Sequence, residues 1–193
     1  MKHTVVAMLE DRPGVLNRVV SLFRKRGFNI QSLTVGPTEI AELSRMTLVV
    51  DGDEAIIEQV VKQLYKVVDV VKVTDLTNEP MVARELALVK VSSTNQARGE
   101  IMQIADVFRA KVLDVSTNSI ILEVTGTEQK IDALIELLRG FGIKETVRTG
   151  RVAMIRGPLT SRGEDAPPTY RATGTNGRRT VRMVPSSRNI DDE

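Results

Sequence analysis

The feature that most limits how this chain folds is an internal repeat. The apolar positions of one strand and the helix after it recur later in the chain at a constant offset. Met46, Leu48, Val50, Gly52, Ile57, Val60, Val61 and Leu64 correspond to Ile120, Leu122, Val124, Gly126, Ile131, Leu134, Ile135 and Leu138. The preceding helices align at a larger offset, because the first copy has a longer loop around residues 36–44. The chain is therefore expected to contain two copies of one small fold.

Each copy has the apolar periodicity of a βαββαβ unit. In the first copy, strand patterns cover residues 3–9, 29–36, 44–50 and 67–73, and helical patterns follow residues 14 and 52. One arc of the first helix contains Val15, Leu16, Val19, Val20, Leu22 and Phe23, and Gly27 is expected to end this helix. Residues 84 to about 150 repeat the order. The predicted fold class is α+β, with two ferredoxin-like domains, each an antiparallel sheet with two helices on one face.

Composition suggests where these domains begin and end. We expect a first domain over residues 1–77, a linker over residues 78–83 and a second domain over residues 84–157. From Pro158 onward the chain contains four of its seven prolines and few large apolar residues. Residues 158–193 are therefore predicted to form a disordered extension, in which a short ordered piece near residues 180–184 remains compatible with the pattern.

Composition also argues against several classes of function. The chain has no cysteine and one histidine, so a thiolate metal site is excluded and a histidine cluster is not expected. A net charge of +2 gives no indication of a nucleic-acid partner. The N-terminal apolar run is interrupted by Glu10 and Asp11 and is too short for a signal peptide or a membrane span. We expect a cytoplasmic protein that is neither a membrane protein nor an enzyme, because no catalytic constellation or phosphate-binding loop is present.

One turn of the first copy has the features of a ligand site. Asp11-Arg12-Pro13-Gly14 opens the first helix, where unpaired N–H groups and the helix dipole favour a carboxylate. Asp11 is suitably placed to accept from an ammonium group, and Asn29 can contribute if the second strand begins nearby. Taken alone, the motif is better explained by Asp11 as a helix cap and by a turn at Pro13 and Gly14. The corresponding loop of the second copy, residues 92–99, lacks the Asp-x-Pro-Gly arrangement.

Several segments, in this order and spacing, resemble the small regulatory subunit of acetolactate synthase. They are Glu10-Asp11-x-Pro13-Gly14-Val15-Leu16, Leu22-Phe23-x-x-Arg26-Gly27-Phe28-Asn29-Ile30-x-Ser32-Leu33, Leu43-Ser44-Arg45-Met46-Thr47, Arg84-Glu85-Leu86-Ala87-Leu88-Val89-Lys90-Val91, Phe108-Arg109 and Asp114-Val115. The resemblance covers residues 1–157 and implies that the first domain is an ACT domain, a ferredoxin-like amino-acid sensor. The second domain is then ACT-like.

The resemblance implies a homodimer through the ACT domains that binds valine, and in some cases leucine or isoleucine, between two protomers. The backbone N–H groups of Gly14, Val15 and Leu16 would receive the effector carboxylate, and Asp11 would face its ammonium group. Asn29 and Ile30 would come from the other protomer. The implied partner is the large catalytic subunit, which would carry thiamine diphosphate, a divalent metal and FAD, whereas this chain would carry no cofactor or metal of its own. Stimulation and feedback inhibition of that subunit would be its function.

Two other binding functions remain open at this level. An ACT domain that senses an amino acid for a different enzyme would share the fold and the turn, although the second domain's resemblance favours acetolactate synthase. An RNA-binding module is the other alternative, because a ferredoxin-like sheet is also the platform of the RRM. That function requires aromatic side chains on strands, and the four Phe and two Tyr do not have this pattern.

Overall fold

The computed structural model describes residues 1–158, 170–173 and 180–183 of the chain. These residues divide between two compact units. Of the described residues, unit 1 contains Met1–Met81 and those from Met154 onward, and unit 2 contains Val82–Ala153. Both units have the βαββαβ order, which confirms the predicted α+β fold with two ferredoxin-like domains.

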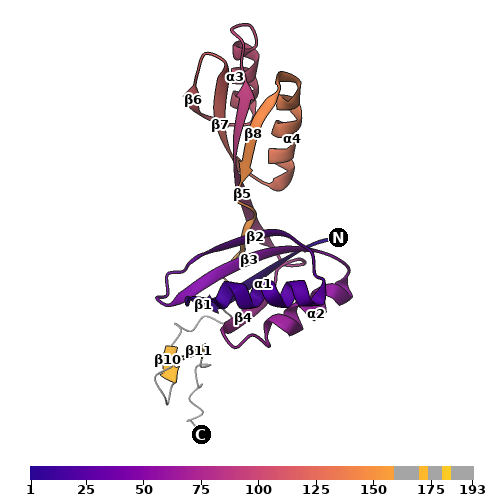
Figure 1. Ribbon diagram of the computed structural model, residues 1–193, viewed down its shortest axis with the longest axis vertical. Coiled ribbons are helices and arrows are strands. Elements are labelled where there is room, and N and C mark those ends of the chain that lie inside the picture. Colours follow the sequence, from indigo (N-terminus) through magenta and orange to yellow (C-terminus); the bar gives the residue numbers. More distant parts are fainter. Residues whose placement is uncertain (159–169, 174–179, 184–193) are drawn as a thin grey trace. The chain divides into compact units, whose positions relative to one another are not determined.

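Unit 1 is a four-stranded sheet with two helices on one of its faces (Figure 1). Its strands are β1 (Lys2–Glu10), β2 (Ile30–Pro37), β3 (Leu43–Asp51) and β4 (Val70–Asp75), in the order β2-β3-β1-β4 with antiparallel neighbours. Its helices are α1 (Val15–Arg26) and α2 (Glu54–Leu64). The outer strands β2 and β4 are the edges of this sheet.

The helix ends of unit 1 follow from local chemistry. Gly27 ends α1 in the left-handed conformation, with φ 69°, where a residue without Cβ is favoured. Asp53 begins α2, and its carboxylate accepts a hydrogen bond from the Ile56 N–H at 2.9 Å. Alternate residues of β1 and β3 then pack against the buried residues of both helices, such as Phe23 and Val60. Burial of each such large apolar side chain contributes about 1.5–3 kcal/mol.

Unit 2 repeats this arrangement. Its strands are β5 (Met81–Ser92), β6 (Lys111–Val115), β7 (Ser119–Gly126) and β8 (Ile143–Arg148), in the order β6-β7-β5-β8, and its helices are α3 (Arg98–Val107) and α4 (Glu128–Leu138). A short 3-10 helix, Arg139–Phe141, follows α4, and β9 (Val152–Ile155) also pairs with β5. Farther along, β10 (Tyr170–Thr173) pairs with β11 (Thr180–Met183).

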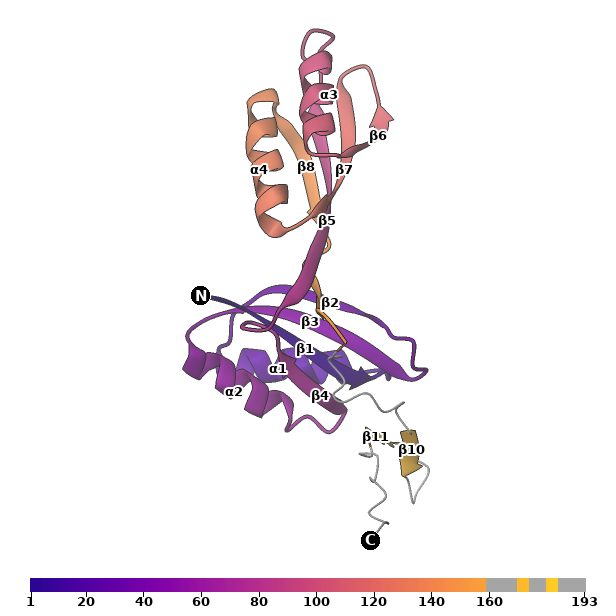
Figure 2. The ribbon, with the colours of Figure 1, turned by 180° about the vertical axis from the view of Figure 1, so that it is seen from behind.

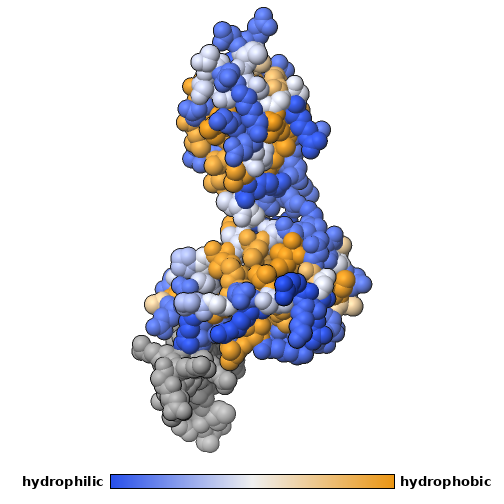
Figure 3. Space-filling model, viewed as in Figure 1, coloured by the Kyte–Doolittle hydropathy of each residue, from blue (hydrophilic) through white to orange (hydrophobic). Residues whose placement is uncertain are grey.

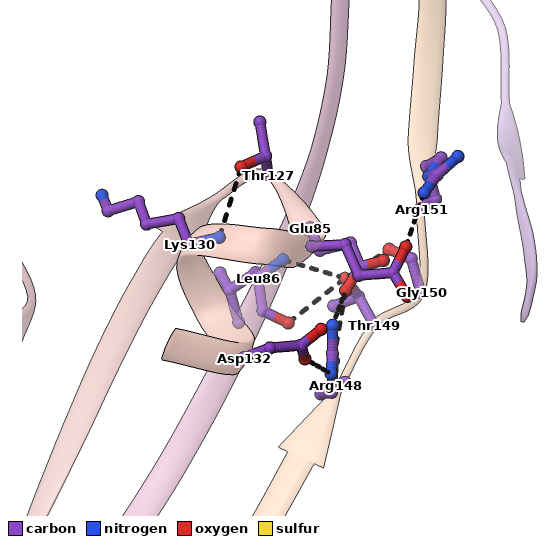
Figure 4. A network of polar contacts seen from close by, with 10 residues as sticks. Glu85, Leu86, Thr127, Lys130, Asp132, Arg148, Thr149, Gly150 and Arg151 are labelled. Carbon is purple, nitrogen blue, oxygen red and sulfur yellow. Dashed lines mark hydrogen bonds and ion pairs between the residues drawn. The ribbon is translucent and has the colours of Figure 1, made fainter. Parts of the chain in front are cut away.

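A network of charged groups joins α4 to the sheet of unit 2 (Figure 4). Arg148, the last residue of β8, donates to Glu85 at 2.5 Å and 3.1 Å and to Asp132 of α4 at 2.6 Å. Burial opposes the charged form of Arg148, but the hydrogen bonds and charges of Glu85 and Asp132 outweigh it and raise the pKa of the guanidinium. Glu85 is buried, so its carboxylate depends on this arginine.

The structure differs from the sequence-based expectation in a few places. The strand β4 begins at Val70 rather than at residue 67, because Val67 and Val70 form hydrogen-bonded turns after α2. The strand β5 begins at Met81, within the segment expected to be a linker. The ordered piece expected near residues 180–184 coincides with β11, whereas residues 159–169, 174–179 and 184–193 lie outside the described residues. Within the described part of the chain, no helix is long and apolar enough to cross a membrane.

Candidate functional site

The first helix of unit 1 begins at an open backbone terminus. Gly14 precedes α1 with φ 87° and ψ −10°, a left-handed conformation that glycine adopts without strain, and no side chain caps the helix. A Cβ built at Gly14 would meet no atom within 4 Å, so the backbone at this point faces open space. The alternative interpretation of Asp11 as the helix cap is therefore wrong.

The N–H groups of this terminus are incompletely used. The Val15 N–H donates to the Arg12 carbonyl at 3.3 Å, and the Arg18 N–H donates to the Gly14 carbonyl at 3.1 Å. Within residues 1–158, the N–H groups of Gly14, Leu16 and Asn17 have no hydrogen-bond acceptor. Unpaired N–H groups at the positive end of a helix dipole suit a carboxylate. Of the three predicted donors, Gly14 and Leu16 are available and Val15 is already engaged.

The Asp11 turn is held by the loop between β2 and β3. The Asp11 N–H donates to the Glu42 carbonyl at 2.8 Å, and the Asp11 side chain is exposed at the mouth of the turn. Glu42 has φ 68°, an unusual conformation for a residue with a Cβ. Thr38 stabilises the loop through its hydroxyl, which donates to the carbonyls of Ile40 and Leu43 at 3.1 Å. This is the loop by which the first copy is longer than the second.

Two ion pairs fix the start of α1 to the end of the sheet. The Arg12 guanidinium lies 3.2 Å from the buried carboxylate of Glu10, and Arg18 pairs with the buried carboxylate of Asp69. The Glu10 N–H also donates to the Asp69 carbonyl at 2.9 Å. Because both arginines already face carboxylates, an anionic ligand at this terminus would rely on backbone N–H groups.

Asn29 and Ile30 lie at the opposite end of the same sheet. In the strand register, Ile30 pairs with Val50, which pairs with His3, whereas Glu10 and the Asp11 turn are at the far end of β1. The residues between His3 and Glu10 span about 23 Å of extended strand. Asn29 is exposed, and Ile30 packs partly against the core. The structure therefore does not bring Asn29 to the Asp11 turn within one chain.

An exposed apolar flank of α1 was not recognised from the sequence. Leu16 and Val20 belong to the apolar arc of this helix, but they are 42% and 41% exposed. Arg18 points toward Asp69, beside β4, so the opposite flank with Leu16 and Val20 faces the β2 edge. Val35 of β2 is 40% exposed and pairs with the core residue Met46, which puts it on the helix side of the sheet. Figure 3 shows the apolar surface of this side of unit 1 in orange.

The corresponding terminus in unit 2 is preceded by a hydrogen-bonded threonine turn. The Thr94 hydroxyl accepts the Ala97 N–H at 3.2 Å, and the Thr94 carbonyl accepts the Arg98 N–H at 3.0 Å. The Arg98 guanidinium donates to the Ser116 and Thr117 carbonyls at 3.1 Å and 3.2 Å. The N–H groups of Gly99 and Glu100, which follow in α3, have no hydrogen-bond acceptor within residues 1–158. The two termini therefore differ in the turn before the helix and not in the presence of unpaired N–H groups.

No catalytic or metal-binding cluster accompanies this terminus. His3 is buried, with Nε2 3.2 Å from the Gly52 carbonyl, and it lies at the end of β1 away from the Asp11 turn. Among the residues that the structure describes, no group of three or more His, Cys, Asp or Glu side chains is arranged to hold a metal ion.

Known proteins match both units. Residues 6–72 match the family of ACT domains like that of the small subunit of AHAS, and residues 84–157 match the family described as the small subunit of acetolactate synthase. The chain is 55% identical over 157 residues to the probable acetolactate synthase small subunit of Archaeoglobus fulgidus, a match that covers 81% of this chain and 98% of that protein. It is 53% identical over 158 residues to the acetolactate synthase small subunit of Bacillus subtilis, covering 81% and 92%.

A solved structure supports the same assignment. The small subunit of acetolactate synthase from Thermotoga maritima is 44% identical and superposes with a TM-score of 0.76. The match covers 82% of this chain and 99% of that one. The chain therefore belongs to the family of acetolactate synthase small subunits, regulatory proteins whose N-terminal unit is an ACT domain.

Proposed function

We propose that this chain senses valine, and secondarily leucine or isoleucine, at the interface of an ACT homodimer and controls a catalytic acetolactate synthase subunit in the cytoplasm. In this proposal it stimulates the catalytic subunit and mediates feedback inhibition. The reaction and its cofactors, thiamine diphosphate, a divalent metal and FAD, belong to that subunit. The observation that carries the proposal is the open start of α1, where Gly14 and Leu16 have unpaired N–H groups.

The effector carboxylate would bind at this terminus. One carboxylate at a helix start gains about 0.3–1 kcal/mol from the helix dipole, which is too little for a sensor. A free amino acid adds an ammonium group, and the exposed carboxylate of Asp11 lies at the same turn. A branched side chain adds apolar contact area. Recognition of all three groups of valine would supply the affinity that the terminus alone lacks.

The exposed flank of α1 and the adjoining edge strand support a homodimer. The β2 edge of the sheet is open to another strand, and Leu16, Val20 and Val35 are exposed beside it. A two-fold interface places the same surface of both copies face to face. Burial of these apolar groups on both copies would stabilise the dimer by about 25 cal/mol per Å² of apolar surface, before the cost of association.

A two-fold dimer through β2 would also explain why the predicted effector residues lie apart. Two β2 strands related by a two-fold axis run antiparallel, so the α1 start of one protomer would approach the Ile30 end of its partner. Asn29 and Ile30 would then complete the site from across the interface. Ile30 would contact the branched side chain, and the amide of Asn29 would supply polar contacts.

Such a site would let valine control the dimer. A ligand that bridges two protomers stabilises the arrangement in which both halves of the site meet, because it binds that arrangement more tightly. The catalytic subunit would respond to this shift with a coupling free energy of about 1–3 kcal/mol.

Reconstitution with the catalytic subunit tests the proposal. Acetolactate formation from pyruvate should rise when this chain is added and fall when valine follows, and the chain alone should form no acetolactate. Gly14→Asp should retain stimulation but abolish the response to valine and its binding in calorimetry, since it adds a negative charge where the carboxylate binds. Activity of the chain alone, or an unchanged valine response in Gly14→Asp, would contradict the assignment.

The dimer interface can be tested separately. Val20→Glu places a charge on the proposed interface and should shift the purified chain toward the monomer in analytical ultracentrifugation. Leu137→Glu is the matched control, because Leu137 is 53% exposed on α4 of unit 2. If both substitutions shifted the chain toward the monomer equally, or if neither did, the α1 and β2 interface would be refuted.

The alternative that the ACT unit serves another enzyme is tested by its binding partner. Affinity purification of the tagged chain should recover a thiamine-diphosphate enzyme. The aromatic residues do not favour the RNA-binding alternative. Phe23, Phe28, Phe108 and Phe141 lie on helices or just after them, and Tyr170 lies on a strand of the two-stranded β10-β11 sheet and not on a ferredoxin-like sheet.

A further inference from the structure

Three large apolar side chains are exposed at the β6 edge of unit 2. Within the described residues β6 pairs with β7 alone, and α3 lies next to it (Figures 1 and 2). Leu113 and Val115 of β6 are 53% and 49% exposed, and Met102 of α3 is 36% exposed. We call these three residues the β6 patch. Apolar groups that gather on a folded surface commonly mark a contact with another protein.

The position of Met102 follows from its neighbour on the helix. The Arg98 guanidinium donates to two carbonyls of the turn directly after β6, so its flank of α3 faces that strand. Met102 lies about one helical turn after Arg98, on the same flank. Val115 pairs with the core residue Ile120, which puts Val115 on the helix side of the sheet. Met102 and Val115 therefore both flank the β6 edge on this side.

The β6 patch repeats the exposed flank of unit 1. Met46 and Ile120 are corresponding positions of the two copies, and they pair with Val35 and Val115, respectively. Val115 thus has the place in unit 2 that Val35 has in unit 1. Met102 has the same relation to β6 that the exposed flank of α1 has to β2. Both units therefore expose apolar side chains beside the same edge of the fold.

The charges of β6 suit a second copy of the same strand. Lys111 begins β6 and Asp114 lies near its end, and both are exposed. Lys111 is 3.6 Å from Glu123 of its own chain, but its side chain remains 78% exposed. If two copies of β6 run antiparallel about their centre, Lys111 of each copy faces Asp114 of the other. A foreign surface would have to match this pattern, whereas a second copy matches it by symmetry.

We propose that unit 2 forms a second two-fold contact between copies of this chain, with the β6 patch of one copy against that of the other. A bulge at Leu113 interrupts the regular ladder, so side chains carry this contact. Three apolar side chains are far fewer than the roughly 20–30 residues that each partner contributes to a standard interface. The contact therefore rests on the homodimer proposed above, because the ACT interface raises the effective concentration of one β6 edge for the other.

The absence of cysteine allows a test by disulfide cross-linking. Leu113→Cys places a thiol beside the symmetry point, where two copies can reach the Cα separation of about 4.4–6.8 Å that a disulfide requires. Val147→Cys is the matched control, because Val147 is also 53% exposed but lies on β8, the opposite edge of the sheet. Both full-length variants are treated with oxidised glutathione at several protein concentrations, and the covalent dimer is measured by non-reducing gel electrophoresis.

Leu113→Cys should cross-link at least about tenfold faster than Val147→Cys. Its rate should not depend on protein concentration, because both thiols already belong to one dimer. Addition of Val20→Glu, which disrupts the proposed ACT interface, should slow the reaction and make its rate proportional to concentration.

Charge reversal tests the antiparallel arrangement. In the Leu113→Cys chain, Lys111→Asp should slow cross-linking, because it would face Asp114 of the other copy. Addition of Asp114→Lys to this variant should restore the rate. Failure of the double reversal to restore it would overturn the pairing of these two residues.

Analytical ultracentrifugation of the unoxidised variants separates the ways to fail. Equal cross-linking of Leu113→Cys and Val147→Cys in a chain that sediments as a dimer would overturn the β6 contact and leave the ACT dimer standing. A monomer would contradict the ACT dimer and the β6 contact together. Slow cross-linking of Leu113→Cys, with protection of its thiol from maleimide when the catalytic subunit is added, would assign the β6 patch to that subunit instead.

Discussion

The starts of α1 and α3 occupy the same place in two copies of one fold but differ in chemistry. At α1, Gly14 is in the left-handed conformation, the backbone N–H groups of Gly14 and Leu16 have no acceptor, and no side chain caps the helix. At α3, the Thr94 hydroxyl and the Arg98 guanidinium satisfy the neighbouring backbone. The fold alone thus does not define the function, because a few residues at one helix end distinguish a candidate sensor from a structural unit.

The two copies are also stabilised by different ion pairs. In unit 1, Arg18 and Asp69 fix the start of α1 beside the candidate site. In unit 2, Arg148 fixes α4 to the sheet through Glu85 and Asp132, far along the chain from the α3 start. Stability and ligand binding should therefore be separable in unit 2 and coupled in unit 1.

The largest expected effect is loss of stability in unit 2 alone. Arg148→Met leaves the buried Glu85 carboxylate without its partner and should cost about 3 kcal/mol of the free energy of unfolding. Asp132→Asn removes the exposed partner and should cost less than about 1 kcal/mol. Denaturant unfolding measures both, and calorimetry should find unchanged valine affinity in both. A loss of valine affinity in Arg148→Met under native conditions would show that valine binding depends on unit 2.

Glycine substitutions compare the two helix starts more closely. Gly14→Ala places a side chain in a left-handed conformation and in the open space before the terminus. It should cost about 1 kcal/mol of stability and lower valine affinity about tenfold, or 1.4 kcal/mol. Gly99→Ala in the first turn of α3 should instead stabilise the chain by about 0.5–1 kcal/mol, with no effect on valine. Similar outcomes at both glycines would mean that the termini are equivalent after all.

Removal of the Thr94 hydroxyl probes the turn that precedes α3. Thr94→Ala deletes the hydroxyl that accepts the Ala97 N–H, and unit 2 should lose about 1 kcal/mol in thermal unfolding. The variant frees one more N–H group, that of Ala97, without the glycine geometry of α1, so it should not acquire valine binding. A second calorimetric site in this variant would show that an unsatisfied helix end is sufficient.

The smallest expected effect concerns the loop that holds the Asp11 turn. Glycine fits the positive φ of Glu42 better than glutamate does, so Glu42→Gly should stabilise unit 1 by about 0.5 kcal/mol. The carbonyl that accepts the Asp11 N–H is retained, and valine affinity should remain within about twofold of wild type. Glu42→Val, which disfavours this conformation, should weaken both stability and valine affinity. If Glu42→Val were more stable than Glu42→Gly, strain at Glu42 would be excluded.

Much of the fold was predictable because strand and helix patterns depend on local periodicity. The repeat of Gly52 and Leu64 as Gly126 and Leu138 sufficed for two βαββαβ units. Exposure of the α1 flank was not predictable, because Leu16 and Val20 lie within the same apolar arc as the buried Val19. Only the position of Arg18 beside Asp69 shows which flank faces the sheet edge.

The candidate site was predictable in part. The Asp11 to Gly14 turn marks an open helix start, but sequence spacing does not show that Asn29 lies at the other end of the sheet. This separation requires knowledge of strand register, which places Ile30 opposite Val50 and His3. The hydrogen bond from the Asp11 N–H to the Glu42 carbonyl likewise depends on a loop conformation that no sequence motif predicts.

The most direct test of a site shared between protomers is complementation of two defective variants. Gly14→Asp disables the helix terminus, and Asn29→Arg, at an exposed position, disables the partner's contribution. Neither homodimer should bind valine. In a mixed dimer, the intact terminus of one protomer meets the intact Asn29 of the other, so calorimetry on remixed chains should recover about a quarter of the wild-type binding stoichiometry, as random pairing of two-fold dimers requires. No recovery in verified mixed dimers would contradict a valine site built from two protomers.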